Sequence, residues 1–352
     1  MIQGQNKNNN EQSYREIFLD SSSSLKDFSL DRRKYLRKYI MSEDVEEKDN
    51  QSIVMGKVVE TLLLEPELFD SRFSLSACAN PPTAMMLEFV EALYRNTIEA
   101  TDEDGNITKT FEERSKAAYL ASGYKIAYEA VLKKFDGSDA EIFYNEILSV
   151  RANRQIVVTA NDVMNAEKIV EELKTNSITS GIVNLVNNVR YTVMNQLQVE
   201  GFEIDGHKFK SMIDKVIVDH KEKTIQLYDL KCVWAVESFY SEYYLYRRSY
   251  IQAYLYKKAV EHLRNITEEY SGYKVLEPMF IVCDSTNYYS PLIYFLHWKD
   301  VVDAYEGFEH NGRKYPGVKE IIEDLKFALD NNTWNISRKN SLANGIINIK
   351  GI

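Results

Sequence analysis

Hydrophobic and polar residues alternate along the chain between residues 196 and 231, and this period of two predicts β-strands. The dipeptide Asp205-Gly206 interrupts the alternation and is typical of a two-residue hairpin turn. The predicted strands cover 196–204, 209–219, 224–231, 278–284 and 290–298.

Other stretches favour helices. The segment 52–64 is apolar on nearly every face, which predicts a buried helix. Ser22 to Ser24 are placed to cap a helix that starts near Leu25. The remaining predicted helices cover 84–135 with a polar loop at 102–106, 160–176, a tyrosine-rich 238–263, and 317–330.

This order of elements predicts one α/β domain, a central mixed sheet flanked by helices with a helical insertion. The expected boundaries are a disordered polar tail at 1–13, a single domain at 14–330 and a C-terminal tail at 331–352. Within the domain we expect N-terminal helices at 14–70, a mainly helical insertion at 71–190, the core at 191–300 and a C-terminal helix at 301–330.

Composition narrows the class of protein. Hydrophobic residues make up 44% of the chain and charged residues 27%, as in ordinary globular proteins. No run of 18 apolar residues occurs and the first residues lack an apolar signal region, so we expect no membrane span and a cytoplasmic location. The three cysteines, without CxxC spacing, count against a disulfide framework, a zinc site or an iron–sulfur cluster.

The formal net charge of −10 argues against a protein that coats nucleic acid by bulk charge. The negative net charge does not exclude an enzyme with one local basic channel. Carboxylates that bind divalent cations also make the net charge more negative.

Two carboxylates and a lysine form the strongest candidate site. If the strands at 209–219 and 224–231 pair through the loop between them, Asp214 lies directly opposite Asp229. Lys231 lies two residues further on the same face. Two acids held together on an apolar face repel each other, and a hard cation such as Mg²⁺ relieves this conflict.

The ordinary interpretation of Asp214, Asp229 and Lys231 is a surface salt-bridge ladder, since Asp-x-Lys is a common sequence. Glu60 shifts the balance, because a carboxylate in the apolar helix at 52–64 is costly unless it is paired or binds a metal. The alternatives for Glu60 are an edge residue that reaches solvent and a partner of a core lysine.

Tyr244, Arg248, Gln252 and Tyr256 recur every four residues in the predicted tyrosine-rich helix and would share one face. Their amide, hydroxyl and guanidinium groups suit contacts with a phosphate backbone. Ordinary packing remains the alternative for most of the tyrosines. No glycine-rich phosphate loop and no nucleophile motif such as GxSxG occurs.

Together, these residues resemble the PD-(D/E)XK nuclease superfamily. Asp214 followed by Asp229-Leu230-Lys231 is similar to its signature, and Gln252-x-x-x-Tyr256 resembles the QxxxY motif of its RecB-like branch. The helix from Met55 to Pro66 is most similar to the phage exonuclease VIII (RecE-type) nuclease domain. The resemblance extends from about residue 14 to 300 and is weak across 70–190.

The resemblance implies that Asp214 and Asp229 are metal ligands, that Lys231 is the catalytic lysine, and that Gln252, Tyr256, Arg248 and Tyr244 support the site and the DNA. Glu60 takes the place of the family's usual histidine and would be the third ligand for Mg²⁺ or Mn²⁺. After Lys231 the family often has Thr or Ser, where this chain has Cys232.

The implied activity is 5′-to-3′ hydrolysis of linear double-stranded DNA during phage recombination. The implied partners are a single-strand annealing protein and further copies of the chain in a ring. Two alternatives are another RecB-like nuclease of repair or defence, and a non-catalytic DNA-binding phage protein with the same fold.

Overall fold

The computed structural model describes residues 14, 17–43, 51–78, 80–153, 155–286 and 290–347. The predicted tail at 1–13 and the last five residues of the predicted C-terminal tail lie outside the described residues. The chain divides into two compact units. We call Ile53–Lys168 the helical unit, and Met1–Ser52 together with Ile169–Ile352 the sheet unit. Each is described by itself.

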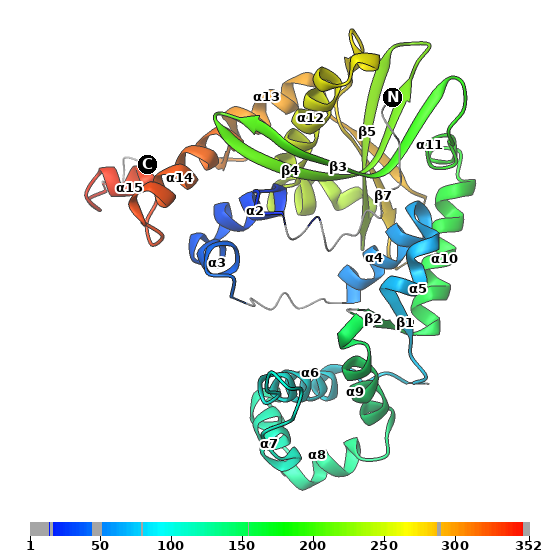
Figure 1. Ribbon diagram of the computed structural model, residues 1–352, viewed down its shortest axis with the longest axis vertical. Helices are drawn as coiled ribbons and strands as arrows, with labels where there is room; N and C mark the ends of the chain where they lie inside the picture. Colours follow the sequence, from blue (N-terminus) through cyan, green and yellow to red (C-terminus); the bar gives the residue numbers. More distant parts are fainter. Residues whose placement is uncertain are drawn as a thin grey trace. The chain divides into compact units, whose positions relative to one another are not determined.

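A mixed sheet forms the centre of the sheet unit (Figure 1). Its strands lie in the order β3-β4-β5-β7-β8, and β6 pairs with β5 off this path. The strands are β3 (Tyr191–Ile204), β4 (His207–Asp219), β5 (Thr224–Val233), β6 (Lys274–Val275), β7 (Met279–Asp284) and β8 (Leu292–Phe295). Pairing is antiparallel except that β5 runs parallel to β6 and β7.

The predicted hairpin between β3 and β4 is confirmed. Asp205 and Gly206 have φ angles of 50° and 71°, the left-handed values that a tight hairpin turn requires. The turn sets the register, which begins at the Ile204–His207 pair. An irregularity between Glu200 and Phe202 is the one register shift along this pair of strands.

Helices and short hairpin strands surround the sheet. They are α2 (Ser22–Leu30), α3 (Arg32–Tyr35), π-helix η1 (Leu36–Ile40), α11 (Ser180–Val183), 3-10 helix η4 (Val236–Ser238), π-helix η5 (Tyr240–Tyr246), α12 (Ser249–Ile266), 3-10 helix η6 (Glu268–Tyr270), α13 (Trp298–Glu306), β9 (Gly307–His310), β10 (Arg313–Pro316), α14 (Val318–Asn331) and α15 (Arg338–Leu342). The expected α/β class, a central mixed sheet flanked by helices, is therefore confirmed.

The sheet and α12 share one core. Val216, Leu227 and other alternate residues of β4 and β5 are buried together with Tyr250, Ile251 and Leu255 of α12. Burial of aliphatic and aromatic side chains of this size is the main source of the stability that holds α12 on the sheet. Because α12 packs on this face of the sheet, the polar residue Gln252 of α12 comes close to β5.

The start of α2 lies three residues earlier than predicted. The helix begins at Ser22, and its N-cap is Ser21, whose Oγ accepts a hydrogen bond from the backbone N–H of Ser24. Ser24 Oγ accepts in return from the N–H of Ser21, which completes a capping box. Ser22 and Ser23 thus belong to the first turn of the helix.

The predicted C-terminal helical region, 301–330, contains a hairpin, β9–β10, between α13 and α14. Two glycines permit the close approach that this hairpin requires. A Cβ atom on Gly317 would lie 2.2 Å from the backbone oxygen of Tyr305, and one on Gly307 would lie 2.9 Å from Gly317 N. The helix predicted at 317–330 is confirmed as α14.

The helical unit contains most of the predicted insertion but begins at Ile53 and ends at Lys168 rather than spanning 71–190. Its elements are α4 (Gln51–Leu64), η2 (Pro66–Leu68), α5 (Phe69–Arg72), β1 (Phe73–Leu75), α6 (Ala84–Glu99), α7 (Phe111–Ser122), α8 (Tyr128–Phe135), α9 (Asp139–Ser149), η3 (Arg151–Asn153), β2 (Ile156–Val158) and α10 (Ala160–Thr175). The unit boundaries fall inside α4 and α10, so the first two residues of α4 and the end of α10 belong to the sheet unit. β1 and β2 pair in parallel, and Phe89, Leu93 and Phe135 lie in a core of their own.

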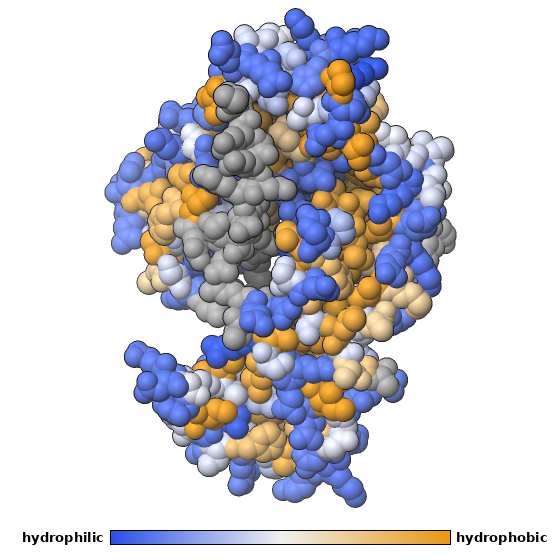
Figure 2. Space-filling view, turned by 45° about the vertical axis from the view of Figure 1, so that its right-hand side comes forward, coloured by the Kyte–Doolittle hydropathy of each residue, from blue (hydrophilic) through white to orange (hydrophobic). Residues whose placement is uncertain are grey.

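On the face drawn in Figure 2, hydrophobic patches lie among hydrophilic ones. Across the described ranges, no helix combines the length and the apolar character needed to cross a membrane.

Candidate active site

β4 and β5 separate at the two aspartates that the sequence singled out. The predicted register is confirmed from Asp219–Thr224 to Lys215–Tyr228, and Asp214 and Asp229 are the next positions along it. There Asp214 Oδ2 accepts a hydrogen bond of 2.7 Å from the backbone N–H of Leu230. β5 then continues beside β7, so one carboxylate from each strand lies where β4 and β5 part.

Asp229 is held at both carboxylate oxygens. Its side chain is buried, with 3% of the residue exposed. Oδ1 accepts a hydrogen bond of 2.7 Å from Gln252 Nε2, and Oδ2 forms an ion pair with the ammonium of Lys231. Charge-assisted contacts of this kind are strong in a low-dielectric interior and fix the plane of the carboxylate.

Gln252 connects Asp229 to α12. Its Nε2 lies 2.8 Å from the hydroxyl of Tyr256, one helical turn further along. Both residues are buried, as their i, i+4 spacing on the face towards the sheet predicts. Burial, together with the nearby carboxylates of Asp214 and Asp229, raises the pKa of Tyr256 well above its usual value, so its phenol keeps its proton.

The prediction of one continuous helix at 238–263 is wrong. The π-helix η5 ends at Tyr246, and Arg248 has a left-handed backbone with φ 56° and ψ 41° before α12 begins at Ser249. Because the helix is interrupted, the spacing of four residues does not put Tyr244 and Arg248 on the Gln252–Tyr256 face.

Tyr244 and Arg248 have other contacts instead. Tyr244 stacks on Tyr240 with ring centroids 5.7 Å apart and makes an edge contact with Phe280 in the core. Arg248 Nη1 donates a 2.8 Å hydrogen bond to the backbone oxygen of Ser29, which links the start of α12 to α2.

Lys26 joins the site and was not among the predicted residues. It lies on α2, and its Nζ donates a 3.3 Å hydrogen bond to Gln252 Oε1. Burial, reinforced by the neighbouring charge of Lys231, lowers the pKa of Lys26 to about 8. A single lysine in a serine-rich stretch carries no signal of its own, since its role depends on α2 and α12 packing together.

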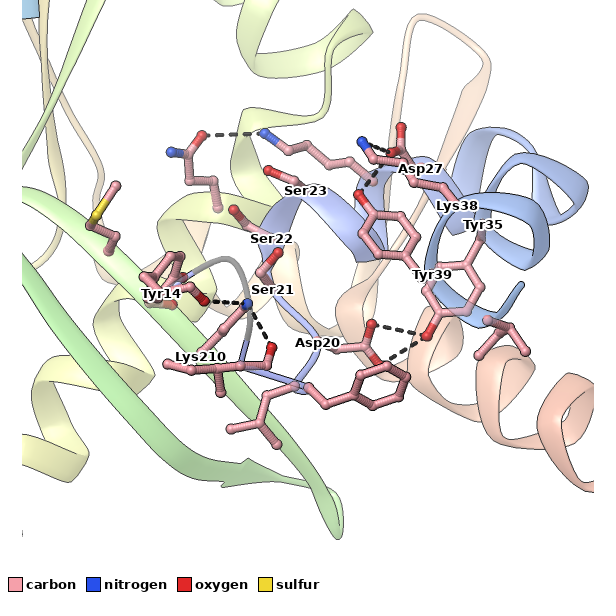
Figure 3. A pocket seen from close by; sticks show the side chains of 18 of the residues that line it. Tyr14, Asp20, Ser21, Ser22, Ser23, Asp27, Tyr35, Lys38, Tyr39 and Lys210 are labelled. Carbon is pink, nitrogen blue, oxygen red and sulfur yellow. Dashed lines mark hydrogen bonds and ion pairs between the residues drawn. The ribbon is translucent and has the colours of Figure 1, made fainter. Parts of the chain in front are cut away.

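A cavity of about 840 Å³ opens beside these residues, and Lys26, Gln252 and Tyr256 form part of its wall. The rest of the wall comes from the N-terminal segment, α2, α3, η1 and the start of β4 (Figure 3). Volumes in this range are usual for ligand-binding pockets.

Hydrogen bonds hold the N-terminal segment against this wall. Asp20 accepts a hydrogen bond from the Tyr35 hydroxyl at 3.0 Å and lies 2.7 Å from His207 Nε2. Lys210 Nζ donates to the backbone oxygens of Tyr14 and Ile17 at 2.7 and 2.8 Å (Figure 3). The N-terminal wall of the cavity is therefore held to β4 by several hydrogen bonds within the sheet unit.

The donor chemistry of Asp214 and Asp229 fits a hard divalent cation. Mg²⁺ is commonly held by one or two carboxylates, with water and substrate oxygens completing its coordination. Among the described residues, no three His, Cys, Asp or Glu side chains group together as a metal site. Glu60, the third predicted ligand, is half-buried on α4 in the helical unit.

Comparison of the chain with known protein families finds no match, and no curated protein matches it either. The chain is similar to a solved structure of a proposed exonuclease from Eubacterium rectale, with a TM-score of 0.47 and 11% sequence identity. The alignment covers 100% of this chain and 96% of the other. A likeness at this level carries no argument about activity.

Proposed function

We propose that this chain is a metal-dependent deoxyribonuclease with a PD-(D/E)XK core. The observation that carries the proposal is the set of contacts around Asp229. Lys231 lies on one of its carboxylate oxygens, Gln252 lies on the other, and Asp214 holds the adjoining backbone of β5. A surface salt-bridge ladder would not bury both carboxylates, whose residues are 8% and 3% exposed.

Each residue then has a chemical task. Asp214 and Asp229 offer carboxylate oxygens to Mg²⁺ or Mn²⁺, which when bound acidifies a water molecule and polarises the scissile phosphodiester. The Lys231 ammonium stabilises the negative charge that develops on the phosphate. Gln252 keeps Asp229 in one orientation, and Tyr256 holds the Gln252 amide.

We further propose, on the resemblance of the sequence alone, that the activity is that of an exonuclease VIII-like enzyme of phage recombination. It would cut linear double-stranded DNA from 5′ ends in the host cytoplasm, as a ring-shaped homo-oligomer with a single-strand annealing partner. Glu60 remains the proposed third metal ligand on the same grounds.

The test is cleavage of linear and closed circular duplex DNA by the purified chain with Mg²⁺. We expect the linear DNA to be degraded and the circle to be spared. Asp229→Asn should lower the rate by at least about a hundredfold, because it removes a charged ligand and the partner of Lys231. Asp330→Asn makes the same chemical change at an exposed position of α14 and should leave the rate unchanged.

Cutting of the circle would contradict an exonuclease. If no metal supports cleavage but the protein binds DNA, the non-catalytic DNA-binding alternative holds. Comparison of 5′-phosphorylated with unphosphorylated ends reports the polarity and the end preference.

A further inference from the structure

Lys26 is a half-buried cation at the wall of the cavity, and in the described part of the chain no carboxylate forms an ion pair with it. Among the described residues its only hydrogen bond is to the neutral amide oxygen of Gln252, at 3.3 Å. Burial of an ammonium without a counter-ion is costly, and the lowered pKa of about 8 reflects that cost. The cavity therefore contains a positive charge that an anion would stabilise.

The carboxylates near Lys26 are already engaged by other cations. Asp229 pairs with Lys231. Asp27 accepts contacts from Lys34 at 2.6 Å and Lys38 at 3.4 Å, and from the Tyr39 hydroxyl at 2.9 Å. Neither is therefore a direct partner for Lys26.

The other two lysines of the cavity have different surroundings. Lys38 is paired with Asp27, as Figure 3 shows. Lys210 holds the backbone oxygens of Tyr14 and Ile17, which fastens the N-terminal segment. Lys26 is thus the cavity lysine whose charge is best placed to meet a ligand.

The rest of the wall favours one kind of anion. Ser22 lines the cavity, and its hydroxyl suits the non-bridging oxygens of a phosphate. The ring of Tyr39, which is only half-buried, also lines it and suits contact with a base. A nucleic acid strand supplies both groups, whereas a small carboxylate or an inorganic anion supplies only the charge.

We propose that Lys26 binds a phosphodiester of the substrate strand next to the bond that is cut, with that strand lying in the cavity. This inference rests on the proposed nuclease function and adds a substrate-binding residue to it. The Lys26 ammonium also donates to Gln252, and Gln252 donates to Asp229. The proposed substrate-binding residue and the proposed metal ligand therefore belong to one chain of hydrogen bonds.

The experiment measures binding of a short fluorescein-labelled DNA duplex by the full chain in EDTA over a series of KCl concentrations. EDTA keeps a metal-dependent enzyme from cutting the probe. Each phosphate contact contributes roughly 0.7 to 0.9 to the slope of log affinity against log salt concentration. We expect Lys26→Met to reduce the slope by about that amount, and the affinity at low salt by about tenfold.

Lys38→Met is the matched control, since Lys38 lines the same cavity but is ion-paired with Asp27. Its slope should equal that of the wild type. Lys26→Gln is the second variant, because it keeps a donor for the Gln252 oxygen while it removes the charge. It should lose the same slope as Lys26→Met, and thermal melting establishes that each variant is folded.

The inference is overturned if folded Lys26→Met or Lys26→Gln binds DNA with the wild-type slope, or if Lys38→Met loses as much. Cleavage of linear duplex by the wild type with Mg²⁺ separates the two proposals. Wild-type cleavage with an unchanged Lys26→Met slope refutes the role of Lys26 alone. A wild-type chain that binds DNA without cutting it refutes the nuclease, while a reduced Lys26→Met slope still supports the binding role.

Discussion

At the scale of single residues, the site depends on how one carboxylate is held. Asp229 has a hydrogen-bond donor on one oxygen and an ammonium on the other, so its orientation is determined by two separate elements, β5 and α12. Partners that orient a ligand commonly matter by tenfold to a hundredfold in activity. Gln252 should therefore be almost as important as the acids themselves.

Gln252→Leu keeps the volume of the side chain but removes its hydrogen bonds to Asp229, Tyr256 and Lys26. We expect the rate of DNA cleavage to fall by about tenfold to a hundredfold. Tyr256→Phe is the milder variant, because Gln252 still donates to Asp229, and it should lose less than Gln252→Leu. Single-turnover rates at saturating Mg²⁺ measure both, and equal losses would contradict this order.

Lys215, which follows Asp214 on β4, allows a pH test of the stability of the fold. Burial lowers its pKa from 10.5 to about 8, and its Nζ contacts Asn195 Oδ1 at 3.3 Å. Between pH 8 and 10 the unfolded chain therefore binds more protons than the folded chain at this residue. The contribution of Lys215 to stability rises with pH across that window and is most unfavourable below it.

Lys215→Met should consequently raise the free energy of unfolding at pH 7 by about 1–3 kcal/mol. The advantage over the wild type should shrink as the pH rises from 8 to 10. Urea unfolding of both proteins across this range measures the difference, and an advantage that does not change with pH would refute the assignment.

At the scale of elements, two departures from regular structure form the site. β4 and β5 stop pairing beyond Lys215–Tyr228, and the Asp214 side chain takes up the N–H of Leu230. The tyrosine-rich segment breaks at Arg248, so that α12 starts afresh and directs Gln252 towards β5. A continuous sheet and a continuous helix would not place these groups together.

The left-handed residue at this break can be tested by substitution. Arg248→Ala and Arg248→Gly both lose the hydrogen bond to Ser29, but only glycine relieves the cost of the positive φ. We expect the alanine variant to be less stable than the glycine variant by about 1 kcal/mol. Denaturant midpoints measure this, and equal stabilities would mean that the backbone at residue 248 changes in the variants.

At the scale of the whole molecule, the chain consists of two compact units with separate cores. The sheet unit carries Asp214, Asp229, Lys231, Gln252 and Lys26, and the helical unit carries Glu60. The net charge of −10 is compatible with DNA binding because the proposed contact is local, through Lys26 in the wall of the cavity.

Glu60→Gln tests the proposed third ligand. If Glu60 binds the metal, the Mg²⁺ concentration for half-maximal cleavage should rise about tenfold, since one charged ligand becomes neutral. Glu67→Gln is the control, because Glu67 is an exposed carboxylate of the same unit. If the Mg²⁺ concentration for half-maximal cleavage is the same in Glu60→Gln and in the wild type, Glu60 is not a metal ligand.

The sequence alone determined the features that depend on near neighbours in the chain. Strand periodicity and two short turns predicted the β3–β4 hairpin and the β4–β5 register from Asp219–Thr224 to Lys215–Tyr228. Asp214 and Asp229 follow at the next positions, where the two strands no longer pair. These are local rules, because a strand alternates its faces and a short turn leaves few registers. The helices at 52–64, 160–176 and 317–330 followed from composition and spacing in the same way.

Only the tertiary structure decided which distant groups meet Asp229. Residue spacing predicted a shared face for Tyr244, Arg248, Gln252 and Tyr256, but the left-handed backbone at Arg248 removed the first two. Lys26 reached Gln252 because α2 packs beside α12, a contact between residues 226 positions apart. Periodicity shows which face of a helix is buried, whereas packing of the whole sheet unit determines what that face touches.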